Sequence, residues 1–191
     1  MSRIVILDGH PDAAPHFIHA AADAYAEGAK DGGHEVRRIA IASLDFPLIR
    51  NEAQFQAHDV PIDILEAQEA LIWSEHVAIF YPLWLGSTPA LFKGFLEQVL
   101  RPHFAFQGQQ RGFPKGLLAG RSARVVVSMG MPAPVYELYY RAHGVKALKR
   151  NVLEFVGLGP VRYAVIGMID GGEARRKRWL ARLRGWGRSA A

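Results

Sequence analysis

Three short segments of the sequence carry the residue types from which a ligand site can be built. The first, Gly9-His-Pro-Asp12, interrupts an apolar run just before a predicted helix. The second, Pro82 to Thr88, contains Leu83-Trp-Leu85, large apolar residues where a turn normally has polar ones. The third, Met129 to Val135, is rich in glycine and proline. Because a helix start favours phosphate, the three segments predict a pocket for a flat, phosphate-bearing ligand.

A flavin nucleotide fits this predicted pocket better than a nicotinamide dinucleotide. The pattern G-x-G-x-x-G, which is typical of dinucleotide sites, is absent after the first predicted strand. A phosphate site, an apolar platform and a loop of exposed backbone groups together suit a flavin. The alternative interpretation is that Trp84 simply covers the core. That does not explain why two other predicted strands also end in irregular loops at the same edge of the sheet.

Two other chemistries are less well supported. His10, His16 and His19 with Asp8 and Asp12 form a group of metal-ligand types, but a catalytic zinc site needs three ligands of fixed geometry, and His16 and His19 fall within a surface helix pattern. No metal is therefore expected. The sequence has no cysteine and no G-x-S-x-G, which argues against a cysteine or serine hydrolase.

The elements that position these segments follow from apolar periodicity. Strands are predicted over residues 3–8, 35–41, 77–81, 123–128 and 161–166. Helices are predicted over about 15–30, 61–74, 89–100, 136–155 with an interruption near Gly144, and 172–186. The alternation predicts an α/β fold, a doubly wound five-stranded parallel sheet of order 2-1-3-4-5 with helices on both faces. A ligand then lies beyond the carboxyl ends of strands one and three.

Local signals complete this prediction. Ser87 or Thr88 is expected to cap the helix that begins near Pro89. Residues 42–60 are interpreted as a long surface connection, and residues 101–114, which are aromatic and rich in glycine, as a functional or interface loop without regular structure.

Composition predicts one domain over residues 1–191, with 50% hydrophobic and 21% charged residues. The absence of a long apolar segment and of a signal region favours a soluble, cytoplasmic protein. Residues 173–191 carry a net charge of +6, so the rest of the chain, at −1, is nearly neutral and no nucleic acid is expected as a partner. The basic terminal helix is expected to dock through an apolar stripe, with a peripheral contact to a membrane protein as the alternative.

Taken together, the motifs resemble the flavodoxin-like NAD(P)H dehydrogenases (quinone), which include quinone reductases, modulators of drug activity and ancillary flavoproteins of potassium-efflux antiporters. The resemblance extends to about residue 170. It rests on Gly9-His-Pro, Pro82-Leu-Trp-Leu-Gly86 with Pro89-Ala-Leu-Phe-Lys-Gly94, Phe104-Ala-Phe106, Met129-Gly-Met131, and Tyr136 followed by His143-Gly144.

This resemblance implies a flavin-dependent oxidoreductase that transfers hydride from NAD(P)H to a quinone or similar flat acceptor by a ping-pong mechanism. It slightly favours FAD, with FMN as the alternative. It also leaves open a regulatory flavoprotein subunit of a membrane cation transporter. Related enzymes complete each pocket across a two-fold interface, so a homodimer is expected, with apolar surface exposed by Phe104 and Phe106 meeting substrate or the partner subunit.

The resemblance further assigns roles to single residues. Tyr136 and His143 are implied as the catalytic pair that manages charge and protons at the reduced ring. The implied cofactor-binding residues are His10, His16 and Phe17 at the phosphate, Pro82, Leu83, Trp84, Leu85 and Gly86 along the ring, and Met129, Gly130 and Met131 at its other edge. Since the family's usual Ser or Thr and Asn are replaced here by Pro15, His16 and Ile18, phosphate binding is expected to depend on backbone N–H groups with His10 and His16.

Overall fold

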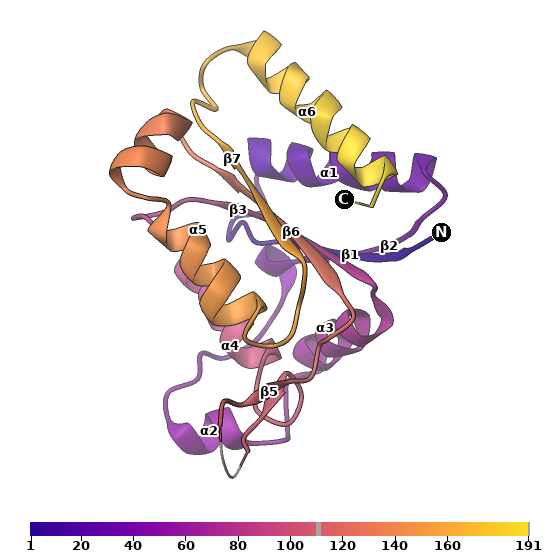
Figure 1. The fold of residues 1–191 in the computed structure, drawn as a ribbon, viewed down its shortest axis with the longest axis vertical. Coiled ribbons are helices and arrows are strands. Elements are labelled where there is room, and N and C mark those ends of the chain that lie inside the picture. Colours follow the sequence, from indigo (N-terminus) through magenta and orange to yellow (C-terminus); the bar gives the residue numbers. More distant parts are fainter. Residues whose placement is uncertain (110–111, 191) are drawn as a thin grey trace.

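The computed structural model describes residues 1–109 and 112–190. Its main sheet is parallel, with the order β2-β1-β3-β6-β7 (Figure 1). The strands are β1 (Arg3–Asp8), β2 (Glu35–Ala40), β3 (His76–Pro82), β6 (Ser122–Ser128) and β7 (Val161–Ile166). Counting only these long strands, this is the predicted order 2-1-3-4-5, which is confirmed.

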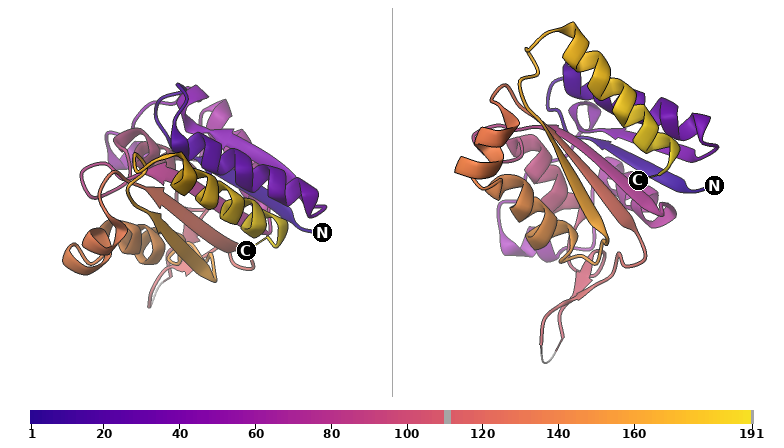
Figure 2. Two further views of the ribbon diagram at one scale, coloured as in Figure 1. Left: turned by 90° about the horizontal axis from the view of Figure 1, so that it is seen from above. Right: turned by 45° about the horizontal axis from the view of Figure 1, so that its top comes forward.

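Helices cover both faces of the sheet (Figures 1 and 2). One face carries α1 (Phe17–Asp31) and α6 (Glu173–Arg188), which lie side by side, and the other carries α3 (Ile62–Trp73), α4 (Ala90–Val99) and α5 (His143–Ala147). Buried side chains form one apolar cluster on each face, because the central strands are buried on both sides. No helix in the described part of the chain is long and apolar enough to cross a membrane.

The basic terminal helix docks on α1 through small residues as well as an apolar side chain. A Cβ atom added to Gly28 would lie 1.9 Å from the carbonyl oxygen of Arg184, and one added to Gly187 would lie 2.1 Å from that of Tyr25. Leu183 is fully buried at this contact. Docking is therefore as expected, but the two helix backbones approach more closely than an apolar stripe alone would require.

Local structure differs from the prediction at several connections. Residues 42–60 begin within a 3₁₀ turn, η1 (Ile41–Ser43), and contain a short helix, α2 (Glu52–Gln56). Within residues 101–114, predicted to be irregular, β4 (Phe106–Gln107) pairs antiparallel with β5 (Lys115–Gly116); residues 110–111 lie outside the described part. The expected Ser87 or Thr88 cap is wrong, because Pro89 occupies the N-cap position of α4.

The helical stretch after residue 134 is broken close to Gly144, as predicted. A π-helical turn, η2 (Val135–Tyr139), ends where Arg141 and Ala142 adopt left-handed conformations with φ of 52° and 51°. The chain then continues through α5 into η3 (Leu148–Leu153). The break turns the chain so that the start of α5 faces the end of β3, where a Cβ atom on Gly144 would lie only 2.0 Å from the carbonyl oxygen of Gly86.

Candidate active site at the strand ends

Three loops start at one level because the ladder holds their strands in register. Asp8 of β1 pairs with Phe80 of β3, and Pro82 of β3 pairs with Ser128 of β6. The N–H of Gly9 donates to the carbonyl of Phe80 at 2.7 Å, and the N–H of Leu83 donates to that of Ser128 at 2.8 Å. These bonds continue the ladder past the strand ends and place the predicted loops together.

Two cavities lie among these loops. The first, which we call the helix-side cavity, has a volume of about 300 Å³. Its lining includes five predicted cofactor-binding residues together with four that were not predicted. The lining residues are His10, His16, Phe17, Pro82 and Trp84, and then Asp12, Ile18, Ser128 and Ile169.

The start of α1 leaves backbone donors available beside this cavity. His16 is the N-cap residue, and its side chain makes no capping hydrogen bond. The first backbone bonds of the helix run from His19 and Ala20 to the carbonyl of His16. The N–H groups of Phe17 and Ile18 thus form no hydrogen bond within residues 1–109 and 112–190. Together with the helix dipole, they suit a phosphate group, so this end of the site fits a flavin nucleotide.

His10 is a buried ionisable side chain of the helix-side cavity, with 5% of its surface exposed. Its Nδ1 lies 3.0 Å from both the backbone N and O of Asp12, so the neutral ring can accept from the N–H and the protonated ring can donate to the carbonyl. The ring stacks on His16 with centroids 3.9 Å apart. Burial, and then the charge of His16, lower the pKa of His10. An anion bound here would offset both effects and favour the protonated ring.

A buried carboxylate holds the first loop in place. Asp8 is 1% exposed, and its Oδ2 lies 2.6 Å from His19 Nδ1 and 2.5 Å from an Arg38 nitrogen. Its Oδ1 accepts from the N–H of His10 at 3.4 Å. His19 therefore pairs with Asp8. No group of three or more His, Asp or Glu residues in the described ranges is arranged to hold a metal ion.

The apolar loop after β3 forms a tight turn. Trp84 and Ser87 exchange two backbone hydrogen bonds of 3.0 Å, and Leu85 and Gly86 both have positive φ, of 46° and 80°. This is the geometry of a type I′ turn, in which leucine is an uncommon and strained residue. The side chain of Leu85 is fully exposed. A strained, exposed leucine beside a cavity is consistent with a functional constraint on this turn.

The turn divides the expected flat platform between two cavities. Pro82 and Trp84 face the helix-side cavity, where the Trp84 ring meets His10 edge-on at 5.8 Å between centroids. Leu83, Leu85 and Gly86 face a second cavity of about 540 Å³, which we call the apolar cavity. The apolar platform predicted for Leu83 to Leu85 therefore borders both cavities.

The predicted site residues that do not line the helix-side cavity line the apolar cavity, with the exception of Phe104 and Phe106. It is lined by Leu83, Leu85, Gly86, Met129, Gly130, Met131, Tyr136 and His143, and by Tyr140 and Gly144, which were not predicted as site residues. The spacing from Tyr136 to Tyr140 is that of one helical turn and is the signal that could have identified Tyr140. For Ser128 and Ile169 in the helix-side cavity the signal was weaker, since only their positions at strand ends mark them.

Tyr136 and His143 lie in different environments. Tyr136 is buried, and its hydroxyl accepts a hydrogen bond from the N–H of Val145 at 3.1 Å. Burial raises the pKa of Tyr136. The hydroxyl thus fixes the start of α5, while the side chain of His143 is exposed at the cavity. These positions suit Tyr136 for positioning and His143 for contact with a ligand.

Phe104 and Phe106 line neither cavity. Both are half-buried within the chain, and Phe106 contacts Phe155 with ring centroids 5.0 Å apart. They expose less apolar surface than expected, because both side chains pack against the core cluster. Phe113, at 93% exposure, is the aromatic residue of this segment that faces solvent.

Comparison with known proteins agrees with this architecture. A solved NAD(P)H:quinone oxidoreductase from Methanothermobacter marburgensis superposes with a TM-score of 0.82 and 23% identity, covering 100% of this chain and 99% of that one. An uncharacterized NAD(P)H oxidoreductase of Haemophilus influenzae is 23% identical over 88% of this chain and 85% of its own. The FMN-dependent NADH:quinone oxidoreductase 1 of Hahella chejuensis is 32% identical over 60% of this chain and 52% of its own.

The names of the two sequence relatives agree with the predicted class of enzyme, an oxidoreductase. They do not support the expected preference for FAD, because the relative whose name specifies a flavin specifies FMN. A family model described as the flavodoxin-like fold matches residues 2–188. Since that match spans nearly the whole sequence, the chain belongs to the flavodoxin-like fold family, as its motifs and sheet order predicted.

Proposed function

We propose that the protein is an FMN-dependent oxidoreductase that transfers two electrons, as hydride, from a nicotinamide nucleotide to a quinone-like acceptor. The observation that carries this proposal is the uncapped start of α1 beside the helix-side cavity. The turn from Trp84 to Ser87 separates this cavity from the apolar cavity. One end suits a phosphate and the other a flat ring. FMN is preferred to FAD because FMN-dependent enzymes are among the relatives.

Particular residues would hold the cofactor. The N–H groups of Phe17 and Ile18, with His10, would bind the phosphate. Trp84 and the 82–86 loop would contact the ring from one side, and Met129 to Met131 would border it on the other. The bound flavin supplies the redox chemistry, and the protein supplies orientation and electrostatics.

His143 has the position of a charge-stabilising group. It lies exposed at the mouth of the apolar cavity, which is otherwise lined by aliphatic, aromatic and glycine residues. A donor in such surroundings stabilises negative charge more strongly than the same donor in water. Tyr136 acts indirectly, because its hydroxyl bonds the backbone next to Gly144 and so fixes the direction of His143.

The size of the apolar cavity supports a ping-pong order. Beside a bound flavin ring, a cavity of about 540 Å³ leaves room for one further flat ring rather than two. A nicotinamide ring and an acceptor ring would then occupy it in turn. The lining contains no carboxylate and no Lys or Arg, which suits an uncharged acceptor such as a quinone.

Exposed apolar side chains around this cavity support a homodimer. Leu138 and Tyr139 are each 79% exposed, and Leu85 and Tyr140, which line the cavity, are exposed as well. A patch of this kind next to a binding site is typical of an interface. A second copy would cover it and give the apolar cavity a further wall; sedimentation equilibrium at micromolar concentration tests this, with a dimer expected.

Comparison of FMN with riboflavin tests the cofactor assignment. Both have the same ring, but only FMN carries the phosphate that the start of α1 would bind. Fluorescence titration should show FMN binding at least about tenfold more tightly than riboflavin. Equal affinities would contradict the phosphate position, and binding of neither would contradict the proposed function.

A further inference from the structure

The strand β7 leaves one edge of the main sheet unpaired. It pairs only with β6, and the carbonyls of Pro160 and Ile166 accept from the N–H groups of Ala123 and Met129 at 3.0 and 2.9 Å. In a parallel ladder the backbone groups of successive residues point alternately to the two sides of the strand. The even-numbered residues of β7 thus face β6.

The odd-numbered residues Val161, Tyr163 and Val165 therefore turn their backbone N–H and C=O groups outward. The structure gives these groups no hydrogen-bond partner among residues 1–109 and 112–190. An edge of this kind is a template for another extended chain, and proteins usually protect it unless they use it. Here neither a proline nor a bulge interrupts residues 161–166.

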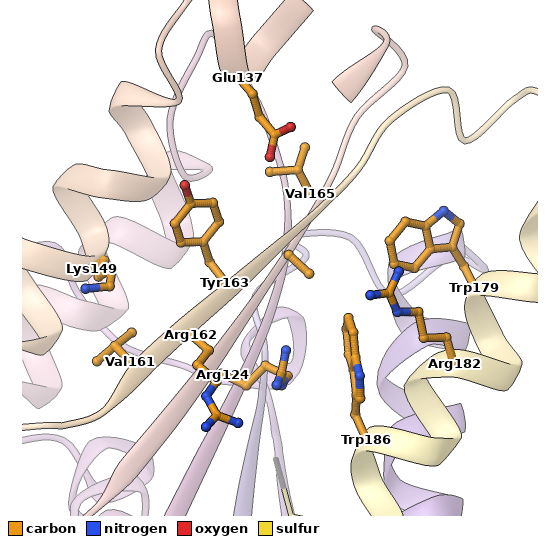
Figure 3. A pocket seen from close by; sticks show the side chains of 11 residues that line it. Arg124, Glu137, Lys149, Val161, Arg162, Tyr163, Val165, Trp179, Arg182 and Trp186 are labelled. Atoms are coloured by element: carbon orange, nitrogen blue, oxygen red, sulfur yellow. The ribbon is translucent and has the colours of Figure 1, made fainter. Parts of the chain in front are cut away.

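A groove runs along this edge. Its volume is about 570 Å³, and every residue from Val161 to Val165 lines it, so that it is long rather than round. Trp179, Arg182 and Trp186 of α6 form its far wall (Figure 3). The groove is separate from both cavities of the candidate active site, with which it shares no lining residue.

Positive charge gathers in the groove. Arg162 projects from β7 and Arg182 from α6, and neither forms an ion pair with any residue that the structure describes. Arg124 lies between them, stacked on the Trp186 ring at 4.2 Å. Burial lowers the pKa of Arg124, and the charges of Arg162 and Arg182 lower it further. Arg162 and Arg182 thus each repel the charge of Arg124, and an acidic ligand would relieve this.

We propose that the outer edge of β7 binds an extended, acidic peptide segment of a partner protein by strand addition. The backbone of Val161, Tyr163 and Val165 would pair with the segment, and Arg162 and Arg182 would bind its carboxylates. Glu137 lies beside Val165 at the end of β7, whereas Arg162 lies near its start (Figure 3). The carboxylates of the peptide would therefore lie toward the start of β7, away from Glu137.

Two other occupants fit the groove less well. A second copy pairing β7 with β7 would bring the same arginines together, and like charges in an interface are unfavourable. A nucleic acid would need open aromatic faces for its bases, but Arg182 stacks on Trp179 and Trp186 at 5.2 and 4.7 Å.

The test uses a fluorescein-labelled hexapeptide in which glutamate alternates with valine, and fluorescence anisotropy with the full chain. Two further peptides carry N-methyl groups on all glutamates or on all valines, because each set removes the N–H donors from one edge of the strand. Strand addition predicts that one of the two methylated peptides binds at least about tenfold more weakly than the parent, while the other keeps its affinity. Equal binding by both would overturn the proposal, as would no binding by the parent.

Matched protein variants locate the site. Arg162→Glu and Arg178→Glu change the net charge equally, but Arg178 is exposed on α6 outside the groove. Arg162→Glu should weaken binding of the unmethylated peptide about tenfold, and Arg178→Glu should weaken it less than about twofold. Thermal unfolding followed by circular dichroism checks that both variants are folded. Equal losses would overturn the proposal. A change of oligomeric state on Arg162→Glu would assign the edge to a second copy and would also overturn it.

Discussion

Trp84 is the side chain on which the proposed ring site depends most. It is 49% exposed and contacts His10 across the helix-side cavity, so it contributes little to the core. We expect Trp84→Ala to weaken FMN binding about tenfold and to leave the unfolding free energy nearly unchanged. Fluorescence titration and urea unfolding measure the two effects.

Trp73→Ala is the matched control for this variant. Trp73 lies at the end of α3, just before β3 begins and so at the opposite end of that strand from the candidate active site, and Arg37 stacks on its ring at 4.2 Å. It should lower stability without changing FMN affinity. The reverse outcome, with normal FMN binding and a loss of stability in Trp84→Ala, would show that Trp84 covers the core instead.

Substitutions of His143 and Tyr136 should have different effects on the reaction rate and on stability. His143→Ala removes an exposed donor at the apolar cavity and should slow flavin reduction or reoxidation by about tenfold to 10²-fold, with little change in stability. Tyr136→Phe leaves the N–H of Val145 without its acceptor and should cost about 1 kcal/mol of stability with a smaller loss of rate. Unchanged rates in both variants would remove both residues from the mechanism.

At the scale of elements, the approach of α5 to the turn after β3 decides the shape of the apolar cavity. Gly144→Ala would place a Cβ atom about 2.0 Å from the carbonyl oxygen of Gly86, and backbone must move to relieve this contact. We expect a loss of about 1–3 kcal/mol in unfolding free energy and a slower reaction, because His143 moves with the helix.

Gly185→Ala controls for the general effect of alanine in a helix. Gly185 lies within α6, and its added Cβ atom meets nothing within 4 Å. This variant should gain about 0.5–1 kcal/mol, since glycine is unfavourable within helices. If Gly144→Ala were stabilising in the same way, the close contact between α5 and the turn would not be a constraint.

The elements themselves were predictable because their signals are local. Continuous apolar runs such as residues 3–8 indicated buried parallel strands, and the alternation with helices indicated the sheet order. The missed features depend on contacts distant in sequence. Leu85 tolerates a left-handed conformation only because the turn is fixed between neighbouring loops, and the β4–β5 pair of two residues each is too short to have a period.

The candidate active site was predictable in its membership but not in its geometry. The loops after β1, β3 and β6 were identified from where each strand ends, and most of their named residues line the two cavities. Which side of the turn each residue faces could not be predicted, because one reversal between Trp84 and Ser87 decides it. The role of the Tyr136 hydroxyl was missed for the same reason, as its partner is the backbone of Val145.

For the whole molecule, His76 makes stability depend on pH. It is 4% exposed, its Nδ1 pairs with the Ser122 hydroxyl at 2.7 Å, and its Nε2 is buried without a partner among the described residues. Burial, and then the charge of Arg124, lower the pKa of His76 to about 4. The unfolded chain therefore takes up a proton near the ordinary value of 6.5 before the folded chain does.

It follows that stability present above pH 6.5 is lost as the pH falls toward 4. The expected contribution of His76 reaches about 3 kcal/mol at the acid end. His10, whose pKa is also lowered, acts in the same direction. Urea unfolding at pH 7 and pH 5 should show a smaller pH-dependent loss for His76→Gln than for the wild type. Equal losses in the two proteins would contradict the assignment.

The most direct test of the proposed oxidoreductase activity is anaerobic stopped-flow absorbance on the protein loaded with FMN. NADH or NADPH should bleach the band of the oxidised flavin in a single phase, and a soluble quinone added afterwards should restore it without nicotinamide present. We expect two separate half-reactions because the nicotinamide ring and the quinone would occupy the same apolar cavity one after the other. A flavin band that neither nicotinamide nucleotide bleaches, or that a quinone does not restore, would contradict the proposed function.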